Sequence, residues 1–473
     1  MLTRLKVNGF KNLRDVDLRF SPFTCIAGPN GAGKSNLFDA ILFLSDLSSM
    51  PLMKAASRVR GTNGRVADFV NLFARNGDQT SGTMEFVAEI IVPGEVVDDF
   101  ERVARPTATF LEYSLVLRLN TDSVATPSRD LIYIEKETLK ALSSSQSDRL
   151  LEFPQRIEIP KRFVFGPGKR TQPFIATESD LDPVLLMYGE GGRSGRPTKV
   201  PARKSPQTVL SSVNSSSHPT VLCTRREMQS WRLLQLEPTA LRKADEFASD
   251  SRMTATGEHL PNTLERLGKS APVANQLAEL IPGVSSVDVD SDDVRQQRTI
   301  QVTMQGGQRY SASSLSDGTL RFLALSVLAS DVQATGLICM EEPENGIHPL
   351  KIPDMLRLVR SLSDADFEKE DWDDSLAIRQ VIINTHSPLV VAELTDGELL
   401  MAETLRLRGT TFIHFKPLSG TWRKVGASPA ESITRGELQG YLQGSGARPS
   451  GATRSKHRVG DRLDSTGDLF QTT

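Results

Sequence analysis

The sequence predicts an α/β fold made of two strand–helix blocks separated by a large insert. In the first block, an apolar stretch at 23–28 runs into a glycine-rich turn, and apolar residues at helical spacing follow from Asn36 to Leu47. A second strand–helix block extends from about 297 to 425. Between them, at 121–290, the composition shifts to Gly/Ser/Pro-rich stretches interleaved with helical patterns.

Composition limits the class of protein. The chain has 473 residues, 38% apolar residues and a net charge of −2, which excludes a chain disordered throughout and a globally basic coat protein. No apolar run is long enough to span a bilayer, and the start has no apolar signal region, so we expect a cytoplasmic protein. Three cysteines without a close pair exclude a disulfide scaffold and a zinc ribbon.

The remaining elements follow from local patterns. Alternating residues predict half-buried strands within 4–20 and at 84–92 and 109–119. Within the insert, helical spacing predicts helices at 227–236 and 260–267. The Gly/Ser/Thr/Arg-rich stretch from Gly444 is expected to be disordered.

The glycine-rich turn carries a phosphate-binding motif. It fits G-x4-G-K-S throughout and lies between a strand and a helix, which is the context this motif requires. Glycines let backbone N–H groups approach phosphate oxygens, and the helix N-terminus favours anions. Lys34 would supply a charge to the phosphates and Ser35 a hydroxyl ligand to Mg²⁺. The motif reads Gly28-Pro29-Asn30-Gly31-Ala32-Gly33-Lys34-Ser35.

Two adjacent carboxylates follow a second apolar strand. The apolar residues 335–340 run directly into Glu341 and Glu342. A carboxylate at the end of such a strand can hold the water shell of Mg²⁺, and the next one can polarise the attacking water. The alternative, a solvated acidic helix start, explains this arrangement less well.

Two further segments leave alternatives open. Leu315-Ser316-Asp317-Gly318-Thr319 opens an apolar helix, where it would form either an anion site or a simple N-cap. The apolar strand at 380–384 leads to His386, which would be either a catalytic group or a structural histidine.

The order of these motifs resembles the ABC-type ATPases, and within them the SMC/RecF-like and OLD-like branch. The resemblance covers about 1–95 and 295–400, and includes Phe10-Lys11-Asn12-Leu13 before the P-loop and Glu341-Glu342-Pro343 through His348-Pro349 after the second strand. It implies a P-loop ABC-type ATPase head with an antiparallel β lobe and a large inserted α+β domain. Stand-alone members of this branch, such as Septu-type ATPases, act in anti-phage defence beside a separate nuclease.

The resemblance also implies residue roles. Residues Gly28 to Ser35, with Asn36, would bind ATP; Ser35 and the Walker B acid Glu341 would hold Mg²⁺; and Glu342 would be the catalytic base. His386 would be the switch histidine, and Ser316 and Gly318 would contact the γ-phosphate of the opposite subunit. Lys11 and Asn12 would touch the base or ribose. The usual Walker B Asp is Glu341 here, and the Q-loop glutamine has no clear position, with Gln79 as a candidate.

The length of the insert separates the function classes. Lys34 and Ser316 lie 282 positions apart, which argues against a transporter subunit and suits the SMC-like branch. Because 87 residues follow His386, we expect no Toprim domain of the OLD type. The interpretation is an ATPase that dimerises, or forms a higher homo-oligomer, around ATP to control a DNA-directed or partner nuclease. The alternatives are a RecF-type repair ATPase and a scaffold that binds ATP without turnover.

An excess of basic residues within the insert is consistent with contact to DNA. Residues 161–226 hold eleven basic and four acidic residues in a chain of net −2. Such a basic run is typical of phosphate-backbone contact, and equally of a solvated loop. We therefore expect four regions: residues 1–120 as the first half of the head, 121–290 as a partner- or DNA-sensing insert, 291–425 as the second half, and 426–473 as a tail.

Overall fold

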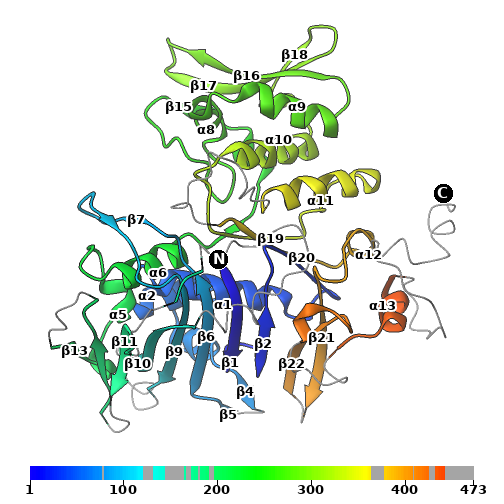
Figure 1. Cartoon of the computed structure of the whole chain (residues 1–473). Coiled ribbons are helices and arrows are strands. Elements are labelled where there is room, and N and C mark those ends of the chain that lie inside the picture. The colour runs from blue at the N-terminus through cyan, green and yellow to red at the C-terminus, as the bar shows by residue number, and fades with distance from the viewer. Residues whose placement is uncertain are drawn as a thin grey trace.

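The computed structural model contains two large β-sheets and an upper lobe of helices and short strands (Figure 1). It describes residues 1–76, 79–120, 131–143, 164–166, 172–178, 182–190, 196–363, 378–407, 410–424 and 432–442. Among these residues, no helix combines the length and the apolar character needed to cross a membrane.

The larger sheet is antiparallel throughout and has eight strands in the order β13-β12-β11-β10-β9-β6-β1-β2. In chain order, they are β1 Leu2–Asn8, β2 Val16–Arg19, β6 Thr83–Ile91, β9 Phe110–Leu119, β10 Ile132–Ala141, β11 Ile175–Glu178, β12 Val184–Met187 and β13 Thr198–Pro201. Its alternating burial confirms the half-buried strands predicted from the sequence and the antiparallel β lobe.

The second sheet is mostly parallel and has the order β14-β19-β20-β3-β21-β22. Its strands are β3 Phe23–Ala27, β14 Arg232–Leu234, β19 Leu337–Glu341, β20 Gln380–Thr385, β21 Leu399–Leu407 and β22 Thr410–Pro417. Only the β21–β22 pair is antiparallel. β3 and β19 are separated by β20, and the carboxyl ends of all three meet at one edge.

Both faces of the parallel sheet are buried, as its continuous apolar runs require. Ile26 and Ile382 belong to the core shared with α1 (Lys34–Leu47) and the antiparallel sheet, whereas their neighbours Cys25 and Ile383 belong to the core shared with the upper lobe. Successive side chains of each strand therefore point to opposite faces of the parallel sheet. One of these faces packs on α1, which lies between the two sheets.

The other helices cover these sheets and build the upper lobe. They are α2 Leu52–Arg58, α3 Val66–Val70, α5 Val209–Ser212, α6 Pro219–Gln229, α7 Pro238–Leu241, α8 Leu260–Leu267, α9 Ser270–Leu280, α10 Asp317–Ser330, α11 Ile352–Ser361, α12 Pro388–Ala392 and α13 Arg435–Leu442, with 3₁₀ turns η3 Ala202–Lys204, η4 Ala312–Ser314, η5 Pro349–Lys351 and η6 Trp422–Lys424. Short hairpins are formed by β4 Arg75–Asn76 with β5 Gln79–Thr80, and by β7 Val96–Val97 with β8 Val103–Ala104.

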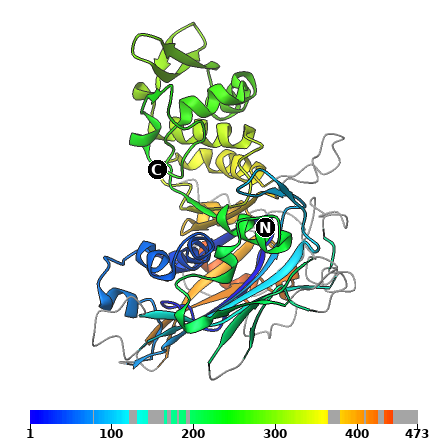
Figure 2. The ribbon, with the colours of Figure 1, turned by 90° about the vertical axis from the view of Figure 1, so that its left-hand side faces the viewer.

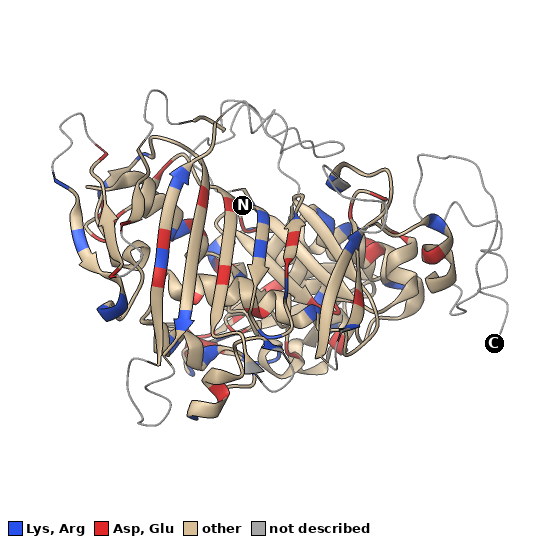
Figure 3. Ribbon diagram, turned by 90° about the horizontal axis from the view of Figure 1, so that it is seen from below, with Lys and Arg blue, Asp and Glu red and all other residues tan. Residues whose placement is uncertain are grey.

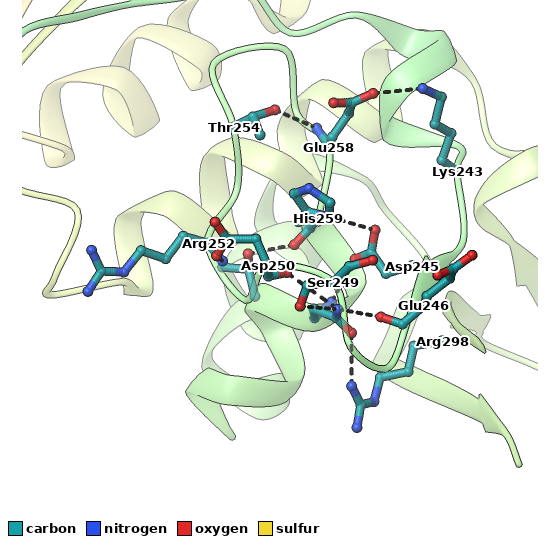
Figure 4. A network of polar contacts seen from close by, with 12 residues as sticks. Lys243, Asp245, Glu246, Ser249, Asp250, Arg252, Thr254, Glu258, His259 and Arg298 are labelled. Carbon is teal, nitrogen blue, oxygen red and sulfur yellow. Dashed lines mark hydrogen bonds and ion pairs between the residues drawn. The ribbon is translucent and has the colours of Figure 1, made fainter. Parts of the chain in front are cut away.

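The upper lobe rises above the edge of the parallel sheet (Figure 2). It contains α8 to α10 and a small sheet of β15 Asp245–Glu246, β16 Val284–Asp292, β17 Gln297–Met304 and β18 Arg309–Ser311. A polar network holds the loop between β15 and α8 (Figure 4). In it, Asp245 accepts from the backbone N–H of Asn262 at 3.0 Å and lies 3.3 Å from His259 Nδ1.

The expected insert, 121–290, is divided among three places. β10 to β13 extend the antiparallel sheet, β14 joins the edge of the parallel sheet, and α8, α9 and β16 enter the upper lobe. The helix predicted at 260–267 is confirmed as α8. The helix predicted at 227–236 is wrong beyond Gln229, because Arg232–Leu234 pairs with β19 as a strand.

The expected tail, 426–473, also contains an ordered part. Residues 432–442 include α13, whose Leu438 and Leu442 are buried in the core of the upper lobe and the parallel sheet. The apolar spacing within this short helix is masked by the polar composition around it. Residues 443–473 lie outside the described part of the chain.

Candidate functional site

The glycine-rich turn links β3 to α1. Gly31 and Gly33 have φ of +76° and +98°, which side chains rarely adopt. A Cβ on Gly33 would also lie 2.2 Å from Asn12 Nδ2. Glycine is therefore required at this turn, which directs backbone N–H groups and the start of α1 towards a cavity.

Lys34 is folded back onto the turn. Its Nζ donates to the carbonyl oxygens of Gly28 and Pro29 at 2.7 and 3.0 Å. Burial lowers the pKa of Lys34, although the nearby acids Glu342 and Glu344 oppose this effect. The ammonium is thus held close to the cavity by weak acceptors that an anion can replace.

Glu341 ends β19 directly opposite Asn384 on β20. Burial raises the pKa of its carboxyl, but hydrogen bonds from Arg60, Ser35 and Asn384 outweigh this effect and hold the pKa below the usual value. The Ser35 hydroxyl, the Glu341 carboxylate and the Asn384 side chain thus form a group of oxygen ligands of the kind that Mg²⁺ prefers. The donor set fits that ion.

Glu342 has a strained backbone with φ of +44°. Its N–H donates to the main-chain oxygen of Asn384 at 3.0 Å and lies 3.2 Å from Asn384 Oδ1. Its carboxylate Oε1 lies 2.8 Å from Nδ1 of His386, and both side chains are partly exposed. His386 thereby fixes the orientation of the Glu342 carboxylate. A carboxylate held in this way can orient a water molecule and accept a proton from it.

A cavity of about 700 Å³ brings most of these residues together. Its lining consists of Asn30, Gly31, Gly33, Lys34, Ser35, Leu234, Gln235, Leu236, Glu237, Arg321, Leu325, Met340, Glu341, Glu342, Pro343, Asn345 and Asn384. Segments far apart in the sequence therefore meet at one edge of the parallel sheet, as the motif order predicts.

Gln235 is a glutamine of the cavity wall that the motifs in the sequence did not indicate. It follows β14 at the edge of the sheet and lines the cavity. The sequence predicted a helix over 227–236, so Gln235 was not recognised as a residue at the end of a strand. The strand before Gln235 has three residues, which are too few to show a pattern. The side chain of Gln79 lies outside the described residues, and its backbone is in the β4–β5 hairpin.

Arg60 is a second residue without a sequence signal. Its guanidinium lies 3.0 Å from Glu341 and 3.2 Å from Asp39 of α1. Lys11 contacts the same group, since its Nζ donates to Asp39 at 2.7 Å and to the Arg60 carbonyl at 2.9 Å. Lys11, expected near a base or ribose, is thus engaged beside the cavity and does not line it in this structure.

Asn12 supports the turn from behind. Asn36 Nδ2 donates to Asn12 Oδ1 at 2.7 Å, and Asn12 Nδ2 contacts the carbonyl of Ala32 at 3.4 Å. Its side chain also fills the space that a Cβ on Gly33 would occupy. Asn12 and Asn36 therefore contribute to the shape of the turn in this structure.

Ser316 and Gly318 lie at the start of α10 and, within the described residues, do not line the cavity. Ser316 is an N-cap whose Oγ accepts from the Thr319 N–H at 3.2 Å. Arg242, which follows α7, donates to the Leu315 carbonyl at 2.9 Å and to Asp317 at 2.6 Å. The segment from Gln235 to Arg242 thus connects the cavity wall to this turn.

Part of the basic run at 161–226 makes contacts within the protein, as far as the described residues show. Arg225 donates to the carbonyls of Ser48 and Val213, and Arg226 pairs with Asp99. Lys161, Arg162, Lys169, Arg170 and Arg193 lie outside the described residues. On the strands of the antiparallel sheet, Lys and Arg positions are interspersed with Asp and Glu positions (Figure 3). One such pair, Lys140 and Glu112, lies at 2.8 Å.

Two family models match the chain. Residues 1–69, which include the glycine-rich turn, match the "RecF/RecN/SMC N terminal domain". Residues 188–392, which include Gln235, Ser316, Glu341 and His386, match the family described as "AAA domain, putative AbiEii toxin, Type IV TA system". The two matches therefore cover the early and the late motifs of the site.

Individual relatives match short segments. The chain is 52% identical over 48 residues to the OLD nuclease of Thermus scotoductus, which is 10% of this chain and 9% of that protein. It is 50% identical over 44 residues to the DNA replication and repair protein RecF of Haemophilus ducreyi, which is 9% of this chain and 12% of that protein. An SMC head solved with the C-winged helix domain of ScpA superposes with a TM-score of 0.46 at 14% identity, over 88% of this chain and 98% of that one.

Proposed function

We propose that this chain, an ABC-type ATPase of the SMC/RecF/OLD-like branch, binds ATP with Mg²⁺ in the cavity at the ends of β3, β19 and β20 and hydrolyses it. The observation that carries the proposal is the meeting of Lys34, Ser35, Glu341 and Glu342 around one cavity. Each residue type has a separate task in phosphoryl transfer, and the four come from two distant segments.

Phosphate binding would use the glycine-rich turn and Lys34. The backbone N–H groups from Gly28 to Asn36 would surround the phosphates, and Lys34 would leave the Gly28 and Pro29 carbonyls to contact the β- and γ-phosphates. Ser35 and Glu341 would hold Mg²⁺, which offsets phosphate charge when bound.

Hydrolysis would use Glu342 as the base. Asn384 holds the strained backbone of Glu342 through the Glu342 N–H, and the Glu342 carboxylate would take a proton from the attacking water. His386, 2.8 Å from this carboxylate, would keep it in place and act as the switch histidine.

The shared site would require a second copy of the chain. Ser316 and Gly318 lie outside their own cavity and at the surface of the upper lobe, where they would contact the γ-phosphate held by the partner subunit. The expected assembly is a homodimer with two such sites, or a higher homo-oligomer built from it.

Nucleotide binding and steady-state phosphate release test the ATPase. Lys34→Ala should abolish ATP binding, while Lys54→Ala, a lysine exposed on α2, should leave binding unchanged. Glu342→Gln should bind ATP without turnover, because only the proton acceptor is lost. ATP affinity of Lys34→Ala within a few-fold of wild type, or turnover by Glu342→Gln at the wild-type rate, would contradict the assignment.

Mixing variants tests the shared site. Ser316→Arg should bind ATP as a subunit but not hydrolyse it, because the longer side chain blocks docking on the partner's γ-phosphate. A mixed dimer of Ser316→Arg and Lys34→Ala carries both lesions in one site and none in the other. Activity recovered on mixing supports the shared arrangement, and none recovered argues for chemistry within one subunit or for strictly coupled sites.

ATP-driven closure of the dimer would control a DNA-directed activity or a partner nuclease in anti-phage defence. The matches to the OLD nuclease and to the AbiEii-related family support this class, and the match to RecF supports a repair ATPase as the second candidate. A pull-down from the native host with mass spectrometry separates them: a nuclease partner favours defence, and recombination proteins favour repair. A protein that binds ATP but releases no phosphate with either partner would be a scaffold.

A further inference from the structure

The helix α13 contacts the loop that carries His386. The hydroxyl of Tyr441 donates a hydrogen bond to the main-chain carbonyl of His386 at 2.8 Å. On the other side, the His386 ring lies 2.8 Å from the Glu342 carboxylate. One residue, His386, therefore connects α13 to the proposed base.

α13 is firmly attached to the rest of the molecule. At its start, the Thr434 N–H donates to the Glu437 carboxylate at 2.8 Å, and the Glu437 N–H lies 3.3 Å from Thr434 Oγ1, which is a capping box. Leu438 and Leu442 are buried in the same core as α12, the helix that begins two residues after His386. Tyr441 is thus presented from a fixed position.

The hydroxyl is suited to this contact. Burial raises the pKa of Tyr441 to about 12, so that the group stays protonated and can donate at neutral pH. Pro388, two residues after His386, has no N–H and restricts the backbone conformation of Ser387. The loop therefore has one backbone hydrogen-bond donor fewer after His386. The peptide between His386 and Ser387 is thus held on both sides, because its carbonyl accepts from the Tyr441 hydroxyl and its N–H donates to Thr385 Oγ1 at 2.9 Å.

We propose that Tyr441 is a positioning residue for His386, so that α13 sets the geometry of the His386–Glu342 pair. This inference rests on the proposed function, because it assigns α13 a part in ATP hydrolysis. The charged groups that face His386 are Glu342 and Glu344, both from the loop after β19. Tyr441 is not among the described residues that line the cavity, and it acts only through His386.

A first experiment is independent of nucleotide. The chain has six histidines, so labelling with ¹³Cε1-histidine gives few imidazole signals in the nucleotide-free protein. Tyr441→Phe should shift and broaden the His386 signal. Tyr310→Phe, a change on β18 that removes the hydroxyl bonded to the Gln308 side chain, should not. An unchanged His386 signal in Tyr441→Phe overturns the inference.

A second experiment measures hydrolysis. Loss of one hydrogen bond should lower kcat by about three- to tenfold while KM for ATP stays at its wild-type value. Replacing Tyr441 by 4-aminophenylalanine, which keeps a donor at the same place, should restore kcat. Equal kcat in Tyr441→Phe, or no recovery with the amino analogue, overturns the inference. Absence of hydrolysis in the wild-type protein would instead overturn the proposed function, and the His386 signal would still decide the contact.

Discussion

The guanidinium of Arg60 forms a two-point ion pair with the carboxylate of Glu341, at 3.0 and 3.1 Å. The same guanidinium lies 3.2 Å from Asp39, and Lys11 holds the Arg60 carbonyl. Because Glu341 is the proposed Walker B acid, Arg60 and Mg²⁺ would compete for the same carboxylate. Metal binding would then have to release Glu341 from Arg60.

Removing this competitor should favour the metal. Arg60→Ala should lower the Mg²⁺ concentration that half-saturates ATP binding, by up to about fivefold, since a partly exposed pair contributes at most about 1 kcal/mol. A fluorescent ATP analogue titrated at several Mg²⁺ concentrations measures the effect. Arg58→Ala, which loses only the pair with Asp46 at 3.5 Å, is the control. An unchanged or higher Mg²⁺ requirement in Arg60→Ala would show that the pair does not compete.

The link between Arg242 and the start of α10 should affect turnover more than binding. Arg242→Ala and Asp317→Ala should each lower kcat by up to about fivefold, because each frees the turn that presents Ser316. The double variant should be no slower than Arg242→Ala, since that substitution already removes the bond to Asp317 together with the bond to the Leu315 carbonyl. Steady-state kinetics with KM for ATP measured in parallel tests this.

Lys243→Ala is the matched control for that cycle, since Lys243 is next in sequence but pairs with Glu258. It should behave as wild type. Additive losses in the double variant, or a rise in KM equal to the fall in kcat, would count against a role for Arg242 in holding the turn.

Glu137 should make stability depend on pH. This fully buried carboxyl on β10 accepts from the N–H groups of Val209 and Leu210, yet burial outweighs these bonds and raises its pKa from 4.5 to about 7. The folded state therefore keeps a proton that the unfolded state loses, so the contribution of Glu137 to the free energy of unfolding falls by about 3 kcal/mol as pH rises from about 4.5 to about 7.

Urea unfolding at pH 4.5 and 7.5 tests this, with Glu137→Gln beside wild type. The free energy of unfolding of Glu137→Gln, relative to that of wild type, should be higher at pH 7.5 than at pH 4.5, because the amide does not ionise. Glu135→Gln, on the same strand but partly exposed and paired with Arg118, should follow wild type. Parallel pH profiles for wild type and Glu137→Gln would rule out the proposed protonation.

DNA binding through the basic run remains a prediction, now limited to part of it. Arg225 and Arg226 make internal contacts, so the residues to change to Ser are Arg193, Arg196, Lys199, Arg203 and Lys204. Each lost phosphate contact should lower the salt slope on duplex DNA by about 0.9, so that five contacts flatten it by about 4 to 5. ATP hydrolysis without DNA should not change.

Filter binding at two salt concentrations measures that slope. Ser substitutions of Arg295 and Arg309, exposed on the upper lobe, control for a general loss of positive charge. If affinity and slope match wild type in the five-residue variant, the basic run is a solvated surface and the DNA-directed part of the function loses its support.

Local patterns determined the motifs and most of the strands that carry them. The half-buried strands follow from alternating burial, the P-loop context follows from turn geometry, and the position of the Glu341–Glu342 pair follows from a continuous apolar run. Neighbours along the chain specify each of these patterns. The same reasoning identified His386, because a fully buried strand, β20, leads directly to it.

Only the tertiary structure decided which residues complete the site. Gln235 follows a three-residue strand, and Arg60 lies in a loop between two short helices, so neither has a repeating pattern that sequence reasoning can detect. Tyr441 reaches His386 from α13, 55 positions later in the chain. These contacts depend on the packing of sheets and helices from distant segments, and the spacing of residues along the chain carries no information about them.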